Sequence, residues 1–375
     1  MIPLKNKKLI KSGTRGDFAL LIAVTLLALI GTIFIYSASN YSANATYKDG
    51  LYFVKKQLIG IVLGFISMTA ICFFDYKMLK KFTLPVSIVT FILLALVFVP
   101  GIGVENYGAK RWIGFGGVTL QPSEVAKFSL ILFSSTYVSK NTEKIKTFTG
   151  VLPVLVYGIL VCVLIILEPN MSITVCVAML MLTMLFAAGM KIKHFVVLIL
   201  PALAIGIILI FAEPYRLNRL AAFLNPWSNP KGEGYQLLQS LYALGSGGWF
   251  GVGLFKSRQK YAFLPFAESD FILSVIGEEI GFIGLILFFS LLGFIIWRGL
   301  RIASRAKDVF GYMLAIGITM IFGIQVVVNA LVVTGSIPPT GLPLPLVSSG
   351  NTSIIIFMTE MGILYNISRQ SSLTF

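Results

Sequence analysis

The chain has 375 residues, of which 57% are hydrophobic and only 12% are charged. Soluble globular proteins carry about 25% charged residues, so this composition excludes an ordinary soluble protein. The formal net charge of +15 would favour nucleic acid as a partner of a soluble chain. In a membrane protein it is typical of basic cytoplasmic loops, and we expect no nucleic-acid partner.

Ten apolar segments follow one another along the chain, each near the roughly 20 residues that a helix needs to cross a bilayer. Their approximate bounds are 18–38, 57–74, 82–99, 122–138, 149–168, 171–189, 194–212, 271–297, 311–334 and 351–367. The sequence therefore predicts an all-α polytopic membrane protein with ten transmembrane helices, forming a single integral membrane domain over residues 1–375.

The distribution of basic residues predicts the orientation. If the N-terminus is cytoplasmic, 18 of the 30 Lys and Arg residues fall on its side, 11 fall opposite, and Lys127 lies within a span. Six of those 11 belong to one long loop, where the positive-inside rule has least force. An even number of spans then places both termini in the cytoplasm.

That long loop, residues 213–270, connects the seventh and eighth predicted helices on the extracytoplasmic side. It is rich in aromatic and aliphatic residues, and LLQSLYAL (237–244) has the spacing of an amphipathic helix. Loops of this length are usually functional or disordered. We expect this one to be ordered against the outer face of the membrane.

The connection between the ninth and tenth predicted helices, TGSIPPTGLPLPLVSSGN (334–351), contains four prolines and no charge. Proline interrupts regular helix, and non-helical backbone at membrane depth is tolerated only where protein or a water-filled cavity covers it. The pattern predicts a re-entrant segment that lines a cavity.

Asp270 stands at the end of the long loop, where the eighth predicted helix begins. The same loop carries six basic residues and a glycine cluster: Arg216, Arg219, Lys231, Lys256, Arg258 and Lys260, with Gly245, Gly247, Gly248, Gly251 and Gly253. Cations and free backbone amides suit a diphosphate, and a carboxylate beside it indicates proton abstraction. Alternatively, Asp270 caps the helix, the cations meet lipid headgroups and the glycines allow helices to pack.

Charged residues within predicted spans are costly and are functional candidates unless they pair. Glu124 and Lys127 share a helical face and could form an internal ion pair. Glu278 and Glu279 are adjacent, so their side chains point about 100° apart and are not expected to face one partner. Glu360 lies mid-span without a cation nearby in the sequence, and the sequence assigns it neither a partner nor a function.

Five ordered motifs resemble those of the SEDS polymerases (shape, elongation, division and sporulation), whose members include FtsW, RodA and SpoVE. They are GTIFIYSAS (31–39), RWIGFGGVTLQPSEVAK (111–127), NPWSNPKGEGYQLLQSLYALGSGGWFGVGL (225–254), LPFAESDFILSVIGEEIGFIG (264–284) and QVVVNALVVTGSIPPTGLPLPLVSSGNTS (325–353). The resemblance covers almost the whole chain. SRQKY (257–261) is more similar to the division and sporulation branch, that of FtsW and SpoVE, than to the elongation branch.

The resemblance implies a peptidoglycan glycosyltransferase that polymerises lipid II at the outer face of the bacterial cytoplasmic membrane, for cell division or sporulation. It implies a class B penicillin-binding transpeptidase and other division or sporulation membrane proteins as partners. Asp270 matches the family's essential aspartate. The expected substrate-binding residues are Arg111, Glu124, Lys127, Arg216, Arg219, Gln236, Lys256, Arg258, Lys260, Glu278 and Glu279.

The sequence departs from the family's pattern at a few positions. Phe266 stands where glutamate is common, and Asn170 where aspartate is common. These departures argue against a catalytic role for positions 170 and 266 but leave Asp270 untouched.

The implied mechanism is a single inverting displacement. Asp270 deprotonates an acceptor sugar hydroxyl as it attacks the anomeric carbon of an undecaprenyl-diphosphate-linked glycan. Arg216, Arg219, Lys256 or Lys260, or a divalent cation such as Mg²⁺ or Mn²⁺, would stabilise the departing diphosphate. Two other classes stay open: a flippase for lipid-linked precursors and a non-enzymatic scaffold for division proteins.

Overall fold

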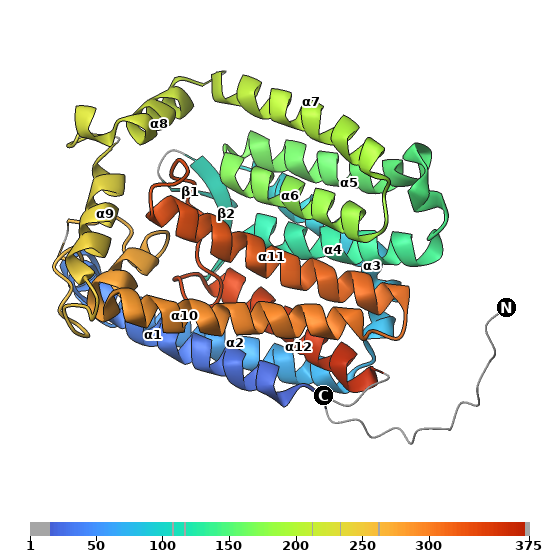
Figure 1. The fold of residues 1–375 in the computed structure, drawn as a ribbon, viewed down its shortest axis with the longest axis horizontal. Helices are drawn as coiled ribbons and strands as arrows, with labels where there is room; N and C mark the ends of the chain where they lie inside the picture. The colour runs from blue at the N-terminus through green and yellow to red at the C-terminus, as the bar shows by residue number, and fades with distance from the viewer. Residues whose placement is uncertain are drawn as a thin grey trace.

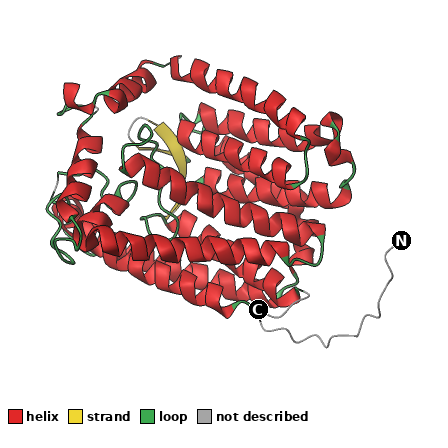
Figure 2. Cartoon of the chain, viewed as in Figure 1, coloured by secondary structure: helices red, strands yellow, loops and turns green. Residues whose placement is uncertain are grey.

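The computed structural model describes residues 16–106, 109–115, 118–211, 213–232, 234–261 and 263–371. Helices form most of this part of the chain (Figure 2). The longer ones are α1 (Phe18–Tyr47), α2 (Tyr52–Phe73), α3 (Leu79–Leu96), α4 (Pro122–Lys140), α5 (Phe148–Leu167), α6 (Met171–Ala187), α7 (Ile192–Phe211), α8 (Pro214–Leu224), α9 (Tyr235–Gly247), α10 (Ile272–Ser304), α11 (Val309–Val333) and α12 (Asn351–Gln370). Three single 3₁₀ turns are η1 (Tyr76–Met78), η2 (Lys144–Lys146) and η3 (Pro226–Ser228).

Each of the ten predicted apolar segments contains a helix, namely α1 to α7 and α10 to α12. Six of these helices are long and apolar enough to cross a membrane: α1, α2, α3 with η1, α5, α10 and α11. Helices α1 and α10 extend furthest beyond their predicted apolar runs, because α1 continues to Tyr47 and α10 to Ser304. Polar residues extend both helices past the ends of their apolar runs.

The described chain is helical as predicted except between α3 and α4, where it forms a small antiparallel sheet. Strands β1 (Gly103–Asn106), β2 (Ala109–Phe115) and β3 (Val118–Leu120) are ordered β1-β2-β3, with Gly103 opposite Ile113 and Ile113 opposite Leu120. The segment is too rich in glycine for a membrane helix. Strand β2, which carries Arg111 and Trp112, packs against α4.

The helices run side by side as a bundle with α11 near its centre (Figure 1). Helix α11 packs against α4, α6, α10 and α12, and α12 packs along α2. Large side chains of α11 such as Phe310 and Phe322 are fully buried. Helix α7 lies along one edge of the bundle and packs mainly against α8 and α6 (Figure 1).

Helices α8 and α9, the sheet and the proline-rich segment gather at the same end of the bundle, on the left of Figure 1. The amphipathic helix expected at 237–244 is confirmed as part of α9, and the described residues of the long loop also form α8 and η3.

Helix α10 is broken at Gly281, which has φ 67° and ψ −171°. The break frees backbone groups that bond to the glycine-rich segment instead. Val252 and Gly253 donate their amides to the carbonyls of Glu278 and Glu279, at 2.9 and 3.1 Å. Gly251, with φ 80°, approaches so closely that a Cβ would lie 2.2 Å from the Glu279 carbonyl oxygen. At Gly251 and Gly281, therefore, the glycines serve backbone packing, the alternative to diphosphate binding.

Candidate functional site

The backbone before α10 is held by the proline-rich segment. Ser348 donates its hydroxyl to the Ser269 carbonyl at 2.6 Å, and the Ser349 amide donates to the Glu268 carbonyl at 2.9 Å. The Asn329 side-chain amide, on α11, donates both to the Asp270 carbonyl at 2.9 Å and to the Leu342 carbonyl at 2.8 Å. Two elements distant in sequence from Asp270, α11 and the proline-rich segment, thus fix the backbone that carries it.

The Asp270 side chain is not a helix cap. Phe271 is the N-cap residue of α10, and no side chain bonds to the free amides of that helix. The carboxylate instead accepts a hydrogen bond from the Ser269 hydroxyl at 3.2 Å. Gly341 lies against it, since a Cβ at that position would stand 3.1 Å from Asp270 Oδ2. The capping alternative is therefore wrong.

Asp270 lines a cavity of about 530 Å³ at the end of the bundle where α8 and α9 lie (Figure 1). Arg111 and Trp112 of β2, Arg219 of α8 and Gln236 of α9 line the same cavity. Residues 339–341 and 343 form part of its wall, which confirms that the proline-rich segment lines a cavity. The site combines a carboxylate, two guanidinium groups and an amide around one space.

A second cavity of about 450 Å³ shares Arg111, Asn170 and Arg219 with the first. Arg216 joins the two shared arginines along its wall, and the rest of the lining is largely apolar. The apolar side chains are Met171, Val175, Met179, Leu220, Val328, Leu331, Ile337 and Leu342. A cavity with cationic and apolar walls fits a ligand with an anionic head and a hydrocarbon tail.

Burial raises the pKa of Asp270 above its ordinary value, whereas the Ser269 hydroxyl, Arg219 and Arg111 act to lower it. Burial and the neighbouring Asp270 also raise the pKa of Glu268. A carboxylate with a raised pKa is a stronger base once it is ionised. Its environment therefore suits Asp270 to accept a proton.

Arg111 is oriented by the turn between α5 and α6. Its Nε donates to the Glu168 carbonyl at 3.4 Å, and its Nη2 donates to the Pro169 carbonyl. These contacts keep the guanidinium at the boundary of the two cavities.

Three residues expected to bind substrate lie instead in a closed cluster beneath the loop. Lys260, Glu278 and Glu279 are at most 6% exposed, and they line neither cavity. Lys260 Nζ lies 3.1 Å from Glu279 Oε1, and Ser37 of α1 donates its hydroxyl to the same oxygen. These groups bond mainly to one another, although Glu279 Oε2 has no hydrogen-bond partner among the described residues. A substrate-binding role for Lys260, Glu278 and Glu279 stays a prediction. We call Ser37, Ser257, Lys260, Glu278 and Glu279 the latch.

The latch also corrects the expectation that Glu278 and Glu279 face different partners. The Ser257 hydroxyl donates to Glu278, and the Ser257 amide donates to Glu279 Oε1 at 3.3 Å. The Arg258 amide donates to Glu278 Oε1 at 2.9 Å. Both carboxylates therefore reach the same loop residue, because Ser257 offers two donors, its amide and its hydroxyl.

The remaining expected residues lie outside both cavities. Glu124 and Lys127 form the predicted buried ion pair, with Lys127 Nζ 2.6 Å from Glu124 Oε1. Lys256 and Arg258 are exposed on the loop. Of the predicted substrate-binding residues, the structure brings Arg111, Arg216, Arg219 and Gln236 together around the two cavities.

Sequence reasoning missed Asn329 and Ser348 as supports of the site. Both are buried. The available signal in the sequence was a polar residue within an apolar segment for Asn329 and within the proline-rich segment for Ser348. Metal binding stays a prediction. Among the described residues, no group of three or more His, Cys, Asp or Glu side chains could hold a metal ion.

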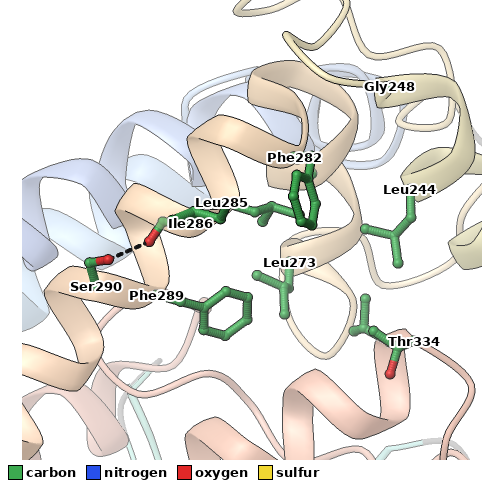
Figure 3. Close-up of a pocket in the computed structure, with 11 residues that line it drawn as sticks. Leu244, Gly248, Leu273, Phe282, Leu285, Ile286, Phe289, Ser290 and Thr334 are labelled. Carbon is green, nitrogen blue, oxygen red and sulfur yellow. Dashed lines mark hydrogen bonds between the residues drawn. The ribbon is translucent and has the colours of Figure 1, made fainter.

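A further cavity of about 680 Å³ lies between α9, α10 and the end of α11 and has no comparable chemistry (Figure 3). Leu244, Leu273, Leu285 and Phe289 line it, and its polar side chains are Ser290 and Thr334. It contains no ionisable side chain, and its size alone does not make it a reaction site.

Comparison with known proteins gives full-length matches. The family model of FtsW, RodA and SpoVE, described as a cell cycle protein, matches residues 18–373. The probable peptidoglycan glycosyltransferase FtsW of Geobacter sp. (strain M18) is 41% identical over 354 residues, which cover 94% of this chain and 96% of the relative. Stage V sporulation protein E of Bacillus subtilis (strain 168) is 39% identical, covering 96% and 98%.

Solved structures agree with the described fold. A chain from work on "structural coordination of polymerization and crosslinking by a peptidoglycan synthase complex" superposes with a TM-score of 0.77 at 26% identity, covering 94% of this chain and 98% of that one. The rod shape determining protein RodA of Thermus thermophilus gives a TM-score of 0.70 at 25% identity, covering 96% and 98%.

Proposed function

Because the chain belongs to the FtsW, RodA and SpoVE family, we propose that it is a peptidoglycan glycosyltransferase that polymerises lipid II. It is a multi-pass membrane protein. The observation that carries the proposal is Asp270, which faces a cavity beside Arg111 and Arg219. The relatives named as glycosyltransferases support the same activity.

Asp270 acts as the general base. An acceptor sugar hydroxyl is far too weak an acid to ionise at neutral pH, so a carboxylate must take its proton as the oxygen attacks the anomeric carbon. The bond from that carbon to the diphosphate breaks in the same step, which inverts the anomer. One carboxylate suffices for this route, by analogy with inverting glycosidases.

Arg111, Arg216 and Arg219 meet the charge that develops on the departing diphosphate, because guanidinium groups bind phosphate oxygens in pairs. The apolar wall of the 450 Å³ cavity then receives the hydrocarbon next to the diphosphate. If a divalent cation such as Mg²⁺ or Mn²⁺ takes part, Asp270 or Glu268 would hold it, and it would supply positive charge that stabilises the departing diphosphate.

The reaction takes place at the outer face of the bacterial cytoplasmic membrane. We propose that α4, α6, α7 and α12 complete ten spans and that both termini are cytoplasmic, with residues 213–270 outside. Two cysteine variants test this topology in a chain from which the native cysteines have been removed. Cysteine in place of the exposed Ser228 should react with an impermeant thiol reagent in intact cells, while cysteine in place of Ser304 should not. The opposite pattern would reject the orientation.

The partner is a class B penicillin-binding transpeptidase, assisted by other division or sporulation membrane proteins. Support comes from the structural relative, which belongs to a peptidoglycan synthase complex that couples polymerisation and crosslinking. The best-matched relatives named above are an FtsW and a sporulation protein, in line with the division and sporulation branch.

A detergent assay separates the three candidate classes. Purified protein is mixed with lipid II and a competent transpeptidase partner, without any membrane to cross. A polymerase makes glycan strands, and the Asp270→Asn protein does not. Absence of strands with the unchanged protein would favour a flippase. A scaffold would support cell growth equally well with and without the Asp270→Asn change.

A further inference from the structure

A second cluster of buried polar groups lies where α4, α6, α11 and α12 meet. It consists of Glu124 and Lys127 of α4, Cys176 of α6, Gln325 of α11 and Glu360 of α12, each at most 2% exposed. Helix α11 packs against the other three helices, and α4 also packs against α6 and α12. We call these five residues the interhelical cluster.

Contacts tie the interhelical cluster together. Lys127 Nζ lies 2.6 Å from Glu124 Oε1 and 5.6 Å from the centre of the Phe357 ring, which is one turn before Glu360. Glu360 interacts electrostatically with both Lys127 and Glu124. Cys176 interacts with the same pair and lies against the Gln325 amide.

The cluster has more negative than positive charge. Two carboxylates face one ammonium group, which leaves an excess of one negative charge when both acids are ionised. Lys127 already makes its short contact with Glu124, so the uncompensated group is Glu360. An uncompensated charge inside a membrane protein is strongly unfavourable unless a cation joins it.

Several buried atoms here also lack a hydrogen-bond partner among the described residues. They are Glu124 Oε2, Glu360 Oε2 and both side-chain amide atoms of Gln325, with Ser123 Oγ beside Glu124. Buried polar atoms nearly always have a protein, water or ion partner. Gln325 is fully buried and supplies an oxygen independently of the acids.

We propose that the interhelical cluster binds one small monovalent cation, H⁺ or Na⁺, with Glu360 as its main ligand. The charge excess of one sets the valence, because a divalent ion would leave an excess positive charge. Carboxylate, amide and hydroxyl oxygens are the ligands that hard cations prefer. The proposal does not rest on the glycosyltransferase activity.

The cluster adjoins both cavities. Cys176 lines the 450 Å³ cavity, and Gln121, one turn before Glu124, lines the Asp270 cavity. Thr352 and Ser353, about two turns before Glu360 on α12, also line the Asp270 cavity. The bound cation therefore stabilises the helices that form the walls of the reaction site.

Two measurements on the full chain purified in detergent test the proposal. For a proton, infrared difference spectra detect a protonated carboxyl group. For sodium, equilibrium binding of radioactive ²²Na⁺ detects the bound ion, and thermal unfolding in NaCl compared with choline chloride detects its effect on stability. The test variant is Glu360→Gln, which keeps the size of the acid. The matched control is Glu143→Gln, since Glu143 is exposed and pairs with Lys146 at 2.7 Å.

A proton site gives a protonated carboxyl band near neutral pH in the unchanged protein and in Glu143→Gln, and in Glu360→Gln the band is smaller by one carboxyl group. A sodium site gives saturable binding of one Na⁺ per chain and a melting temperature that rises by several degrees with NaCl, both lost in Glu360→Gln.

The unchanged protein decides the matter even if Glu360→Gln fails to fold. The proposal is overturned if that protein shows neither a protonated carboxyl band nor bound Na⁺. It is also overturned if the band or the Na⁺ binding persists undiminished in Glu360→Gln. Polymerase activity is not part of the readout, so failure here leaves the proposed function intact.

Discussion

The Asp270 cavity and the latch both combine carboxylates with cations at the outer end of the bundle, but they differ in what their charges contact. In the latch, Lys260 Nζ lies 3.1 Å from Glu279, and both groups are buried. Asp270 faces a cavity, with Arg111 and Arg219 around the same space. The latch charges contact one another, whereas Asp270, Arg111 and Arg219 border a space large enough to hold a ligand.

The largest expected effect is at Asp270. Changing it to Asn or Ala should lower polymerisation by about 10²- to 10⁴-fold, the usual contribution of a general base, because neither side chain accepts the proton. Glu keeps the base but moves it, and a displacement of about 1 Å costs on the order of 100-fold. Glycan strands made from lipid II are the measurement.

All three Asp270 variants should fold and reach the membrane in normal amounts, because Asp270 caps no helix. Near-normal synthesis by the Asn variant would remove Asp270 from the reaction and with it the contrast with the latch.

The latch should respond in the opposite way. Lys260→Met leaves the Glu279 carboxylate buried without its cation, and breaking such a pair costs on the order of 3–5 kcal/mol. Folded protein should be lost, as measured by thermal unfolding in detergent. Adding Glu279→Gln to Lys260→Met should restore most of the stability.

Arg219→Gln is the matched comparison for the latch, because its guanidinium lines the cavity and is exposed. It should leave the melting temperature nearly unchanged. A Lys260→Met protein that melts normally yet makes no strands would return Lys260 to the reaction site.

Gly341 tests how tightly the proline-rich segment positions Asp270. In Gly341→Ala the new Cβ would stand 3.1 Å from Asp270 Oδ2 and should push the carboxylate by a few tenths of an ångström. We expect the rate constant of polymerisation to fall by about tenfold, a smaller loss than that expected for a 1 Å displacement.

Gly189→Ala is the control for backbone strain. Gly189 also has positive φ, 88° against 69° at Gly341, but no atom lies within 4 Å of its would-be Cβ. Both variants should lose on the order of 1–2 kcal/mol of stability from left-handed backbone. Equal loss of activity in the two would show that strain, and not contact with Asp270, is responsible.

The smallest expected effect is a shift in the pH profile. Burial raises the pKa of Asp270, and Arg219 acts to lower it. A base works only when ionised, so activity falls as the pH drops through this pKa. Removing the cation in Arg219→Gln raises the pKa further, and the acid limb of the rate profile should move to higher pH.

Lys231→Gln, on an exposed part of the same loop, controls for the loss of one positive charge. Its acid limb should coincide with that of the unchanged protein. A shift of the same size in both variants would mean that the net charge of the loop, and not contact across the cavity, sets the pKa.

Sequence reasoning located the helices because each apolar run has to satisfy its backbone within itself in a bilayer. It missed the sheet of residues 103–120, whose strand pairing depends on partners that no local pattern specifies. It identified Asp270, Arg216 and Arg219 as neighbours because one loop carries them. Arg111 was implied only by family resemblance, since the sheet brings it to the cavity.

The sequence by itself determined a multi-helix membrane chain, its family and the aspartate at the start of α10, because apolar length and ordered motifs are written along the chain. The Glu124 and Lys127 pair follows from their spacing on one helix, but only the tertiary structure decided which charges come together across the fold. Lys260 and Glu279 close on Ser37 of α1, and Glu360 of α12 interacts electrostatically with the Glu124 and Lys127 pair of α4, across separations of up to about 240 residues. Electrostatic attraction depends on distance and local polarity in space, which helix packing fixes.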